Sequence, residues 1–460
     1  MQYNCDGYEL SDIGQTVYDI ARQEKYRPAS DPIPYCQNRY DGIVFMPNPN
    51  PAFSDQTPTP NGGFDTMAEL AKTAQYEVLY STMWYDKAEN HDSPGAVLAD
   101  AIAELYHNIK QDPSRYPRGL TVRLLLGNPP EFAGGDFSNQ IWNALGDLRD
   151  AGIEKMVDPA IGWRLEVADF EGTAPHSHSK LMVVDGKTAI AAGFNMSYEH
   201  FPVDHPSGKG NGRFDLGIHF TGPVAQAAQR SFDDLWTGSP RRTCAFHPAF
   251  DDAWQFTCRD APATSAHVPE VLRYDLPGGH ANAFSMYRTE AHDEADQQVI
   301  AALAAAQESI DAIHVNFTME LVCDLNLLYN ICTFDNVLPW MDSMLDAAEN
   351  NGARIRVLIK SAPIDGIESS VAVEQFEKKL KERGIQDLVE IRIFDGPMHA
   401  KSALVDDEFL IIGSQNFHYS AFGEGRGLTE YSMGTDDPQA VADYKAVFEY
   451  EWQRAHTFGQ

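Results

Sequence analysis

Apolar positions recur along this chain with two spacings, and stretches of the two kinds alternate from about residue 64 onward. Apolar residues three or four apart predict helices, and short apolar runs between turn residues predict buried strands. One expected helix begins at Ser93-Pro94, and others end at Gly152, Gly352 and Gly384. This alternation predicts an α/β layered fold. The runs expected to form strands are 77–85, 120–126, 163–167, 309–317, 354–359 and 389–394.

The same order of expected elements occurs twice. The run Thr-Val-Arg-Leu-Leu-Leu at 121–126 resembles Arg-Ile-Arg-Val-Leu-Ile at 354–359, and Ala-Gly-Ile at 151–153 resembles Arg-Gly-Ile at 383–385. Such a repeat indicates a duplicated structural unit. We therefore predict two α-β-α sandwich halves related by pseudo-twofold symmetry. The expected ranges are an irregular N-terminal wrap at 1–60, a first half at 61–245, a linker at 246–285 and a second half at 286–460.

A group of polar residues also occurs twice, at corresponding places in the two halves. Each copy has the pattern His-x-Lys-x4-Asp, followed by Gly or Ser and then Asn at the same distance. A single His-x-Lys-x4-Asp match would arise by chance in roughly one chain in twenty of this length, so the repetition makes the pattern specific. The two sets are His178, Lys180, Asp185, Gly193 and Asn195, and His399, Lys401, Asp406, Ser414 and Asn416.

Strand geometry separates these residues by role. Short apolar runs on either side of Asp185 and Asp406 predict two pairs of strands joined by tight turns. Residues two apart on a strand share a face, so the His and Lys of each copy are expected to point the same way. The two aspartates have the opposite parity, and we expect them to be turn or supporting residues. Gly193 and Gly413 suit a close approach of another backbone.

Two such His-Lys faces suit a phosphodiester. Its non-bridging oxygens need cations and amide donors, and the lysines and asparagines of both motifs offer them. In-line displacement at phosphorus needs a nucleophile on one side and a proton donor for the leaving oxygen on the other. His178 and His399, one from each half, fit these roles. We therefore predict one active site between the halves that requires no metal and no cofactor.

An acidic residue follows each motif on an expected strand, Asp215 in the first half and Glu430 in the second. Either could bond the far ring nitrogen of a motif histidine, which would fix its tautomer and support the imidazolium. The alternative for each is an ordinary carboxylate at the edge of a strand. His176, two residues before His178, is expected either to line the cleft or to lie at the surface.

Two insertions interrupt the repeat. Residues 196–212 form a long insertion expected at the mouth of the cleft, and loops of this kind are usually functional or disordered. Residues 317–340 form an apolar insertion. It fits either a contact surface for acyl chains or a bilayer, or a buried flap with a small core of its own.

The net charge of −32 disfavours nonspecific nucleic-acid binding, because an acidic surface repels phosphate backbones. It would also repel strongly anionic membranes, which leaves zwitterionic lipid as the easier target. A soluble surface adapted to salt explains the charge equally well. No apolar run approaches the ~20 residues that span a membrane, so no transmembrane anchoring is expected. We expect a monomer.

The chain has six cysteines, and none lies in a Cys-x-x-Cys pair, so a zinc site is not expected. Pairing of sequence neighbours is preferred because each loop is then short, and it implies an oxidising location outside the cytoplasm. The alternative is six buried free thiols. The polar N-terminus does not resemble a signal peptide, so export would mean that the signal has been removed. The preferred pairs are Cys5 with Cys36, Cys244 with Cys258, and Cys323 with Cys332.

The two motifs resemble those of the phospholipase D superfamily in its duplicated form, and the resemblance covers the chain from about residue 64. It implies a route in which His178 attacks phosphorus and forms a phosphohistidine, while His399 protonates the leaving alcohol and then activates water. It also implies no obligate metal. The first motif has Ala192-Gly193 where the family usually has Gly-Gly or Gly-Ser, which would remove one possible phosphate contact that Ser414 keeps.

The segment 215–224 is similar to the one that follows the first motif in bacterial secreted and synthase members. The resemblance therefore implies a secreted or periplasmic phospholipase D that hydrolyses phosphatidylcholine-like lipids to phosphatidic acid and free head group, with possible transphosphatidylation. One alternative is a nuclease or another phosphodiesterase of the superfamily, which would need a basic groove. A phospholipid synthase would be expected to have membrane helices, and an inactive binding scaffold would be expected to have a damaged motif.

Overall fold

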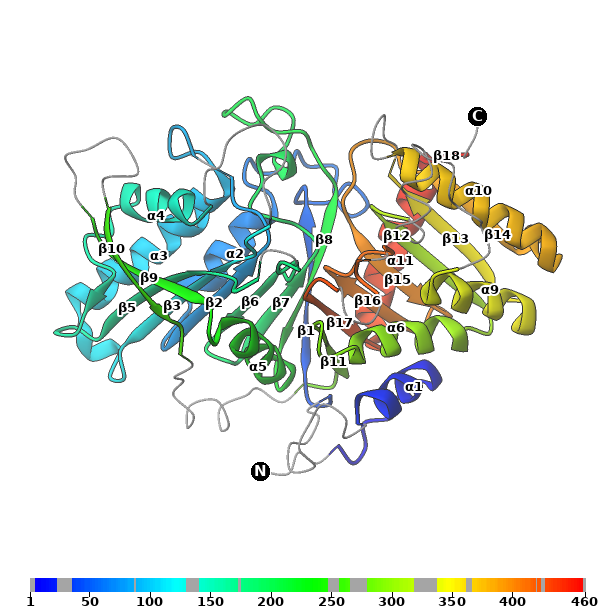
Figure 1. Cartoon of the computed structure of the whole chain (residues 1–460), viewed down its shortest axis with the longest axis horizontal. Helices are drawn as coiled ribbons and strands as arrows, with labels where there is room; N and C mark the ends of the chain where they lie inside the picture. The colour runs from blue at the N-terminus through cyan, green and yellow to red at the C-terminus, as the bar shows by residue number, and fades with distance from the viewer. Residues whose placement is uncertain are drawn as a thin grey trace.

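The computed structural model describes residues 5–22, 35–86, 88–129, 140–172, 175–246, 256–264, 279–317, 337–360, 366–418, 420–422 and 427–457. Over these residues the chain forms a ten-stranded sheet and an eight-stranded sheet, which lie beside each other in Figure 1. In each sheet the central strands are parallel and the strands toward the interface are antiparallel. The α/β fold class predicted from the sequence is confirmed.

The two sheets have the same strand order over six strands. In the first sheet the order is β8 (Asp215–Thr221), β7 (Thr188–Ala192), β6 (Leu181–Val184), β2 (Glu77–Thr82), β3 (Leu120–Leu126) and β5 (Trp163–Asp169). In the second sheet it is β17 (Glu430–Thr435), β16 (Phe409–Gly413), β15 (Lys401–Val405), β12 (Ser309–His314), β13 (Arg354–Ile359) and β14 (Val389–Ile393). The sequence repeat is therefore a repeat of the fold.

Additional strands extend both edges of each sheet. On the interface side, β1 (Arg39–Met46) pairs with β8, and β11 (Ala283–Arg288) pairs with β17. At the far edges, β9 (Pro240–Phe246) and β10 (Phe256–Pro262) follow β5, and β18 (His456–Thr457) follows β14. The short β4 (Val157–Asp158) pairs with β5 alone.

Helices cover both sheets, and buried side chains form three clusters in the described part of the chain. One lies between the first sheet and α2 (Gly63–Lys72), α3 (Pro94–Gln111) and α4 (Gln140–Asp150). Another lies between the second sheet and α1 (Asp12–Ala21), α6 (Glu294–Ala305), α9 (Pro339–Asn351) and α10 (Gly366–Arg383). The third contains side chains of both sheets with α5 (Val224–Trp236) and α11 (Pro438–Arg454), so it joins the halves.

Local sequence accounts for the ends of several helices. Ser93 precedes α3, and its hydroxyl accepts a hydrogen bond from the Ala96 amide while Pro94 occupies the first helical position, as predicted. Gly352 follows α9 with a φ of 76°, a left-handed conformation that glycine adopts without steric cost. Three 3₁₀ turns complete the described elements, at Pro113–Arg115, Tyr198–His200 and Gln386–Leu388.

Two predictions about chain organisation are wrong in part. Residues 1–60 are not irregular throughout, because α1 packs against the second half and β1 is a strand of the first sheet. The predicted linker 246–285 contains β10, which belongs to the first sheet. The apolar residues of β1 are confined to positions 43–46 and are followed closely by prolines, which favoured an irregular assignment.

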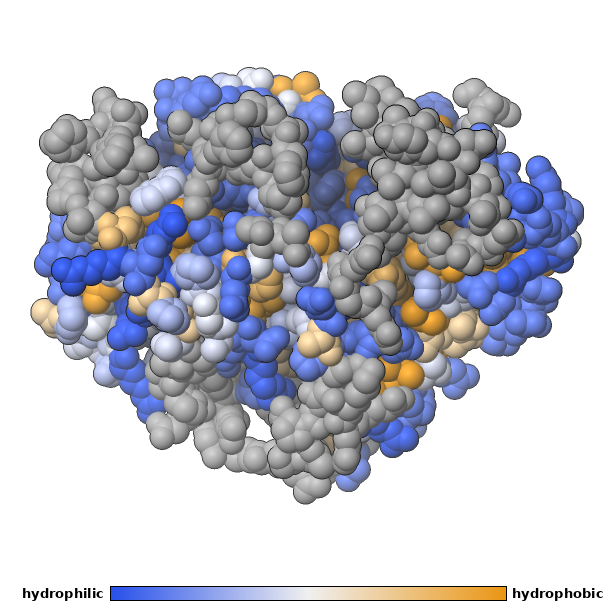
Figure 2. Space-filling view, in the orientation of Figure 1, coloured by the Kyte–Doolittle hydropathy of each residue, from blue (hydrophilic) through white to orange (hydrophobic). Residues whose placement is uncertain are grey.

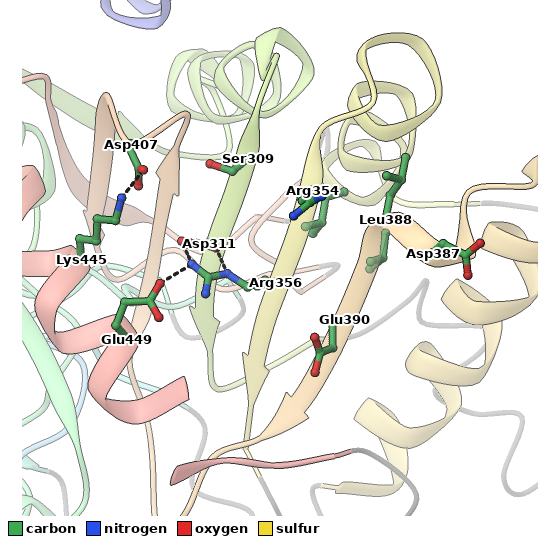
Figure 3. Close-up of a pocket in the computed structure, with 12 residues that line it drawn as sticks. Ser309, Asp311, Arg354, Arg356, Asp387, Leu388, Glu390, Asp407, Lys445 and Glu449 are labelled. Carbon is green, nitrogen blue, oxygen red and sulfur yellow. Dashed lines mark hydrogen bonds and ion pairs between the residues drawn. The ribbon is translucent and has the colours of Figure 1, made fainter. Parts of the chain in front are cut away.

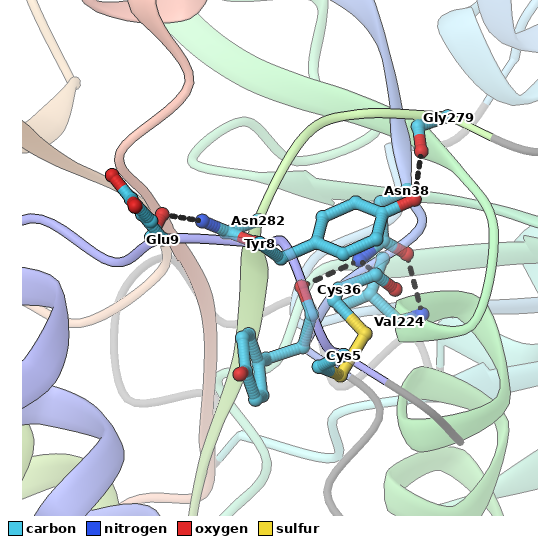
Figure 4. Close-up of a disulfide and its surroundings, with 9 residues drawn as sticks. Cys5, Tyr8, Glu9, Cys36, Asn38, Val224, Gly279 and Asn282 are labelled. Carbon is cyan, nitrogen blue, oxygen red and sulfur yellow. Dashed lines mark hydrogen bonds between the residues drawn. A yellow bond between two sulfur atoms is a disulfide. The ribbon is translucent and has the colours of Figure 1, made fainter.

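Two of the three predicted disulfides are confirmed, Cys5–Cys36 and Cys244–Cys258. Residues 323 and 332 lie outside the described residues. Figure 4 shows the Cys5–Cys36 bridge among hydrogen bonds that join the N-terminal segment to the start of the second half. The Tyr8 hydroxyl donates to the Gly279 carbonyl at 2.7 Å, and the Asn282 side chain donates to the Glu9 carbonyl at 2.9 Å.

The molecular surface is largely hydrophilic on the face shown in Figure 2, most plainly at the end where α10 lies. Among the described residues, no helix has the length and apolar character needed to cross a bilayer.

Candidate active site

The two motif histidines lie where the backbones of the two halves meet. The backbone amide of His178 donates to the Thr429 carbonyl at 2.9 Å, and that of His399 donates to the Phe214 carbonyl at 2.8 Å. Thr429 and Phe214 immediately precede β17 and β8. Each histidine is therefore held by the segment that leads into a strand of the other half. The strands β6 and β15 begin only at residues 181 and 401, so both histidines precede them.

The two acidic residues bond the histidines crosswise between the halves. The Nδ1 atom of His178 lies 2.8 and 2.9 Å from the two carboxylate oxygens of Glu430. The Nδ1 atom of His399 lies 2.8 Å from Oδ2 of Asp215. The sequence suggested both carboxylates as histidine partners but did not indicate that the partners would be exchanged. One site is thereby assembled from both halves.

This bonding sets the state of each imidazole. If Nδ1–H donates to the carboxylate, the lone pair of the ring lies on Nε2, which is the arrangement a nucleophile or a proton carrier needs. Burial lowers the pKa of His178 well below its usual value, and the nearby Lys180 lowers it further. Burial and Lys401 lower the pKa of His399 in the same way. Both rings are therefore neutral at pH 7, and His399 keeps 17% of its side chain exposed.

Glu430 receives a second hydrogen bond, from a serine of its own half. The Ser414 hydroxyl donates to Oε2 at 2.5 Å and accepts from the Tyr431 amide at 2.9 Å. Burial raises the pKa of Glu430 to about 7, and Lys180 and this hydroxyl oppose the rise. We expected Ser414 to contact substrate, but it is fully buried against the carboxylate. It supports Glu430 instead.

The motif glycines leave room for neighbouring groups. A Cβ atom at Gly193 would lie 2.2 Å from Oδ1 of Asp215, so a side chain there would displace the carboxylate that bonds His399. A Cβ atom at Gly413 would lie 2.4 Å from the Cα atom of Ser432. Both glycines were expected to allow a close approach, and both do. Their position gives them no direct access to substrate through a side chain.

The motif lysines are buried and lie beside the histidines. The ammonium group of Lys180 donates to the His178 carbonyl at 2.8 Å. That of Lys401 donates to the His399 carbonyl and lies 2.7 Å from Nδ1 of the same residue. Burial lowers the pKa of Lys180 to about 8 and that of Lys401 well below its usual value. The site therefore contains basic groups whose protonation an anionic ligand would favour.

The motif asparagines complete the polar lining. Oδ1 of Asn195 accepts from the Trp84 backbone amide at 3.3 Å, which leaves its NH₂ end as a donor. Oδ1 of Asn416 is buried and has no hydrogen-bond partner among the described residues. A buried polar atom without a partner is uncommon in a folded protein and is a reasonable contact for a ligand.

Asp185 and Asp406 are structural residues of the turns. Both have positive φ angles, 54° and 53°, in the turns β6–β7 and β15–β16. Each carboxylate accepts hydrogen bonds from three consecutive backbone amides, 75–77 for Asp185 and 307–309 for Asp406. They therefore fix the starts of β2 and β12 and do not face the histidines, as the strand parity indicated.

Sequence reasoning missed two histidines that lie beside the motif histidines. The His200 ring is buried with its centroid 5.8 Å from that of His399. His418 lies close enough to His178 for its charge to lower the pKa of that ring. Burial lowers the pKa of both added histidines to about 4. The signal was present, because a histidine follows the motif asparagine within five residues in both copies.

The insertion 196–212 is ordered against the first half. The Tyr198 amide donates to Asp86 at 2.8 Å, and its hydroxyl donates to Asp92 at 2.5 Å. The insertion brings His200 to the site. The other predicted insertion lies mostly outside the described residues, although Trp340 at its end stacks on Phe417 with ring centroids 4.4 Å apart. His176 is partly buried near His178, between its two expected environments.

One group of residues could hold a metal ion. The ligand atoms of His200, Asp215 and His399 lie within 4.8 Å of one another, the one such group of three in the described part of the chain.

A pocket of about 620 Å³ lies elsewhere, on the face of β12–β14 beside α11 (Figure 3). Several of its charged side chains are already paired. Arg356 bonds Asp311 at 2.6 and 2.7 Å and Glu449 at 2.7 Å, and Lys445 pairs with Asp407. None of the motif residues lines it. We therefore take the crossed histidine–carboxylate pairs, rather than this pocket, as the candidate active site.

A comparison with protein families found one match within the chain. Residues 299–452 match the family described as cardiolipin synthase, PLD-like domain. This range includes the second motif and Glu430. Over these residues the chain belongs to a phospholipase D-like domain family. A search of the curated proteins found no match.

Solved structures also resemble the fold of the chain at low sequence identity. Phosphatidylserine synthase from Haemophilus influenzae Rd KW20 is 12% identical, with a TM-score of 0.58, and the alignment covers 96% of this chain and 91% of the synthase. Nuc from Salmonella typhimurium, a phospholipase D family member, is 18% identical with a TM-score of 0.30, and NucT from Helicobacter pylori is 15% identical with a TM-score of 0.28. Each covers 39% of this chain and 99% of its own.

Proposed function

We propose that this protein cleaves the phosphodiester bond of phospholipids through a phosphohistidine intermediate, without a metal ion, and passes the phosphatidyl group to water. The observation that supports this most is the crossed bonding of His178 to Glu430 and of His399 to Asp215. Two histidines oriented by carboxylates, with two lysines beside them, supply a nucleophile, a proton carrier and charge for the phosphoryl oxygens.

In the first step, the Nε2 lone pair of His178 attacks phosphorus. The bond between phosphorus and the oxygen of the head group breaks, and a protonated His399 gives its Nε2 proton to the departing oxygen. Asp215 supports the imidazolium before the transfer. A bound phosphodiester favours this charge on His399, because its negative charge offsets the lysines that lower the histidine pKa.

In the second step, His399 accepts a proton from water as the water oxygen attacks phosphorus. The bond between phosphorus and Nε2 of His178 breaks, which releases phosphatidic acid and restores both histidines. Lys180, Lys401, Asn195 and Asn416 would hold the phosphoryl oxygens through both steps. The order in which the histidines act is adopted from the superfamily, and the lower exposure of His178 suits the residue that becomes covalently modified.

Several features favour phospholipid over nucleic acid as the substrate. The net charge of −32 opposes a polyanion, whereas it does not oppose a zwitterionic lipid surface. The disulfides suit a protein that is secreted or periplasmic. We also propose that it acts as a monomer, because one chain supplies both halves of the site.

The acceptor deserves a separate test, because the phosphatidylserine synthase aligns with nearly the whole chain. The sequence argued against a synthase only because membrane helices would be expected in one. An alcohol such as serine can replace water in the second step without any change in the roles of the histidines. The assay should therefore offer both acceptors.

The test uses phosphatidylcholine vesicles with EDTA, in buffer alone and with L-serine or ethanol, and a parallel reaction with single-stranded DNA. Wild type is compared with His178→Ala and with a control, His456→Gln, which changes an exposed histidine far from the motifs. We expect choline release that survives EDTA, is lost in His178→Ala and is unchanged in the control. DNA cleavage without choline release would overturn the lipid substrate, and activity in His178→Ala would overturn the mechanism.

A further inference from the structure

We propose that His200, Asp215 and His399 form a binding site for Zn²⁺, and that zinc bound there inhibits the enzyme. Their ligand atoms lie within 4.8 Å of one another, and His399 Nδ1 and Asp215 Oδ2 are already 2.8 Å apart. His200 enters from the insertion 196–212, which contains no motif residue. The inhibition rests on the proposed function, whereas the binding does not.

The set of donors suits zinc. Two imidazoles and one carboxylate with an open position are a common zinc environment, with bonds of about 2.0–2.2 Å. The second nitrogen of His200 also has a suitable partner, since its Nδ1 donates to the Arg213 carbonyl at 3.3 Å. Ligating histidines usually bond a carbonyl or carboxylate in this way, which leaves the Nε2 lone pair for the metal.

The ligands need only a small adjustment. Donor atoms around a tetrahedral zinc ion are roughly 3.3 Å apart, given bonds of about 2 Å. Nδ1 of His399 and Oδ2 of Asp215 are already closer together than this, so the main change is an approach of the His200 ring by at most roughly 1.5 Å.

Charges near the site act in both directions. The carboxylate of Asp215 favours a cation, and Arg213 is paired with Glu199. Lys401 lies against His399, and its charge opposes a cation there. Zinc and a phosphodiester would both engage His399, so their binding is expected to be mutually exclusive.

The consequence for catalysis follows from the shared residues. Zinc on Nδ1 of His399 would replace the hydrogen bond from this nitrogen to Asp215, so the hydrogen of the neutral ring would lie on Nε2. Nε2 could then no longer accept a proton from water in the second proposed step. Among the described residues, the other motif histidine belongs to no equivalent group of three ligands. His418 lies near His178, but the carboxylate of Glu430 already accepts a hydrogen bond from the Ser414 hydroxyl. His418→Gln is therefore a matched control for His200→Gln.

Binding is measured first, by calorimetric titration of Zn²⁺ into EDTA-treated and desalted protein, in enough salt to suppress weak binding to the acidic surface. We expect one tight site in wild type and in His418→Gln, weakened at least tenfold in His200→Gln. X-ray absorption of the zinc-loaded wild type should show two imidazole ligands. This readout needs no variant, so a folding defect in His200→Gln would not leave the question open.

Choline release is then measured against zinc concentration. Inhibition should be reversed by EDTA, and the half-inhibiting concentration should rise at least tenfold in His200→Gln relative to His418→Gln. Equal zinc affinity in the two variants, absence of a tight site in wild type, or zinc coordinated by oxygen atoms alone would overturn the proposal. If the protein released no choline, the proposed function would fail while the binding data still decided the zinc site.

Discussion

The side chains of Asp215 and Glu430 differ in length by one methylene group. The motif residue beside each one also differs, with Gly193 next to Asp215 and Ser414 next to Glu430. The shorter Asp215 approaches so closely that only glycine fits at position 193. The longer Glu430 leaves space for the hydroxyl of Ser414, which donates a hydrogen bond to Oε2 of the carboxylate at 2.5 Å. Gly193, where the first motif departs from the usual pattern, is therefore explained by the close approach of Asp215 and not by the loss of a phosphate contact.

This fit makes Gly193→Ser a damaging change. The added Cβ atom would lie 2.2 Å from Oδ1 of Asp215 and push the carboxylate away from His399. We expect kcat for choline release to fall at least 100-fold with the fold intact, as checked by circular dichroism. Ser414→Gly removes only one hydrogen bond to Glu430, and a loss of roughly tenfold is expected there. Full activity in Gly193→Ser would contradict the assigned role of Asp215.

The titration of Glu430 is expected to set the decline of kcat/KM on the acid side of the pH profile. Its pKa is raised from 4.5 to about 7, so the carboxylate form is present above about pH 7 and is lost as the pH falls through that value. A protonated Glu430 no longer accepts the Nδ1–H of His178, so kcat/KM should decline below about pH 7. Glu430→Gln should lower kcat/KM at pH 8 and remove this limb. If kcat/KM of Glu430→Gln declined below about pH 7 as in wild type, the decline would have to come from the titration of another group.

At the scale of elements, the aspartate of each motif fixes the start of a central strand. Asp185 accepts three backbone hydrogen bonds from residues 75–77 while buried, and Asp406 accepts three from residues 307–309 in a more exposed turn. The motif therefore joins chemistry to folding, because its His and Lys serve the site and its Asp serves the sheet.

Asp185→Ala is accordingly a stability variant. It leaves three backbone amides without their acceptor in a buried place, at a cost of about 2 to 4 kcal/mol. Asp406→Ala should cost less, because water can replace the carboxylate there. Urea denaturation gives both free energies of unfolding. A larger loss for Asp406→Ala would contradict this account, and the folded fraction of either variant should keep its kcat.

The elements that the sequence predicted well are those with local signals. Helix α3 has its cap at Ser93, and strand β3 has the predicted bounds. Strand β1 was missed because it depends on pairing with β8, and β10 because it depends on β9. The exchange of Glu430 and Asp215 between the histidines could not be predicted either, since it follows from how the halves pack. His200 was missed because it belongs to an insertion, outside the repeat.

At the scale of the whole molecule, the halves are joined by more than the active site. The third hydrophobic cluster takes side chains from both sheets, and Tyr40 of β1 donates to Asp443 of α11 at 2.9 Å. The N-terminal segment adds the Cys5–Cys36 bridge near the junction (Figure 4). Stability of the interface and geometry of the site are therefore linked.

Removal of that bridge should destabilise the whole molecule. A cross-link between residues 31 apart lowers the conformational entropy of the unfolded chain, which raises the free energy of unfolding by about 3 to 4 kcal/mol. We expect a Cys5→Ser, Cys36→Ser double variant to unfold at a lower urea concentration, with kcat unchanged before unfolding. The wild type treated with a reductant should show a shift at least as large, because reduction also opens Cys244–Cys258. No shift in either would mean that the N-terminal segment contributes little to holding the halves together.

The crossed pairing also fixes when during synthesis the protein becomes active. His178 is made early, but the carboxylate that orients it is 252 residues further along the chain. His399 must wait in turn for the first half to be folded around Asp215. A chain that ends before residue 430 therefore lacks the His178–Glu430 pair, and one that ends before residue 399 lacks both pairs. Under the proposed function, phospholipid cleavage would therefore begin only after nearly the entire chain has emerged.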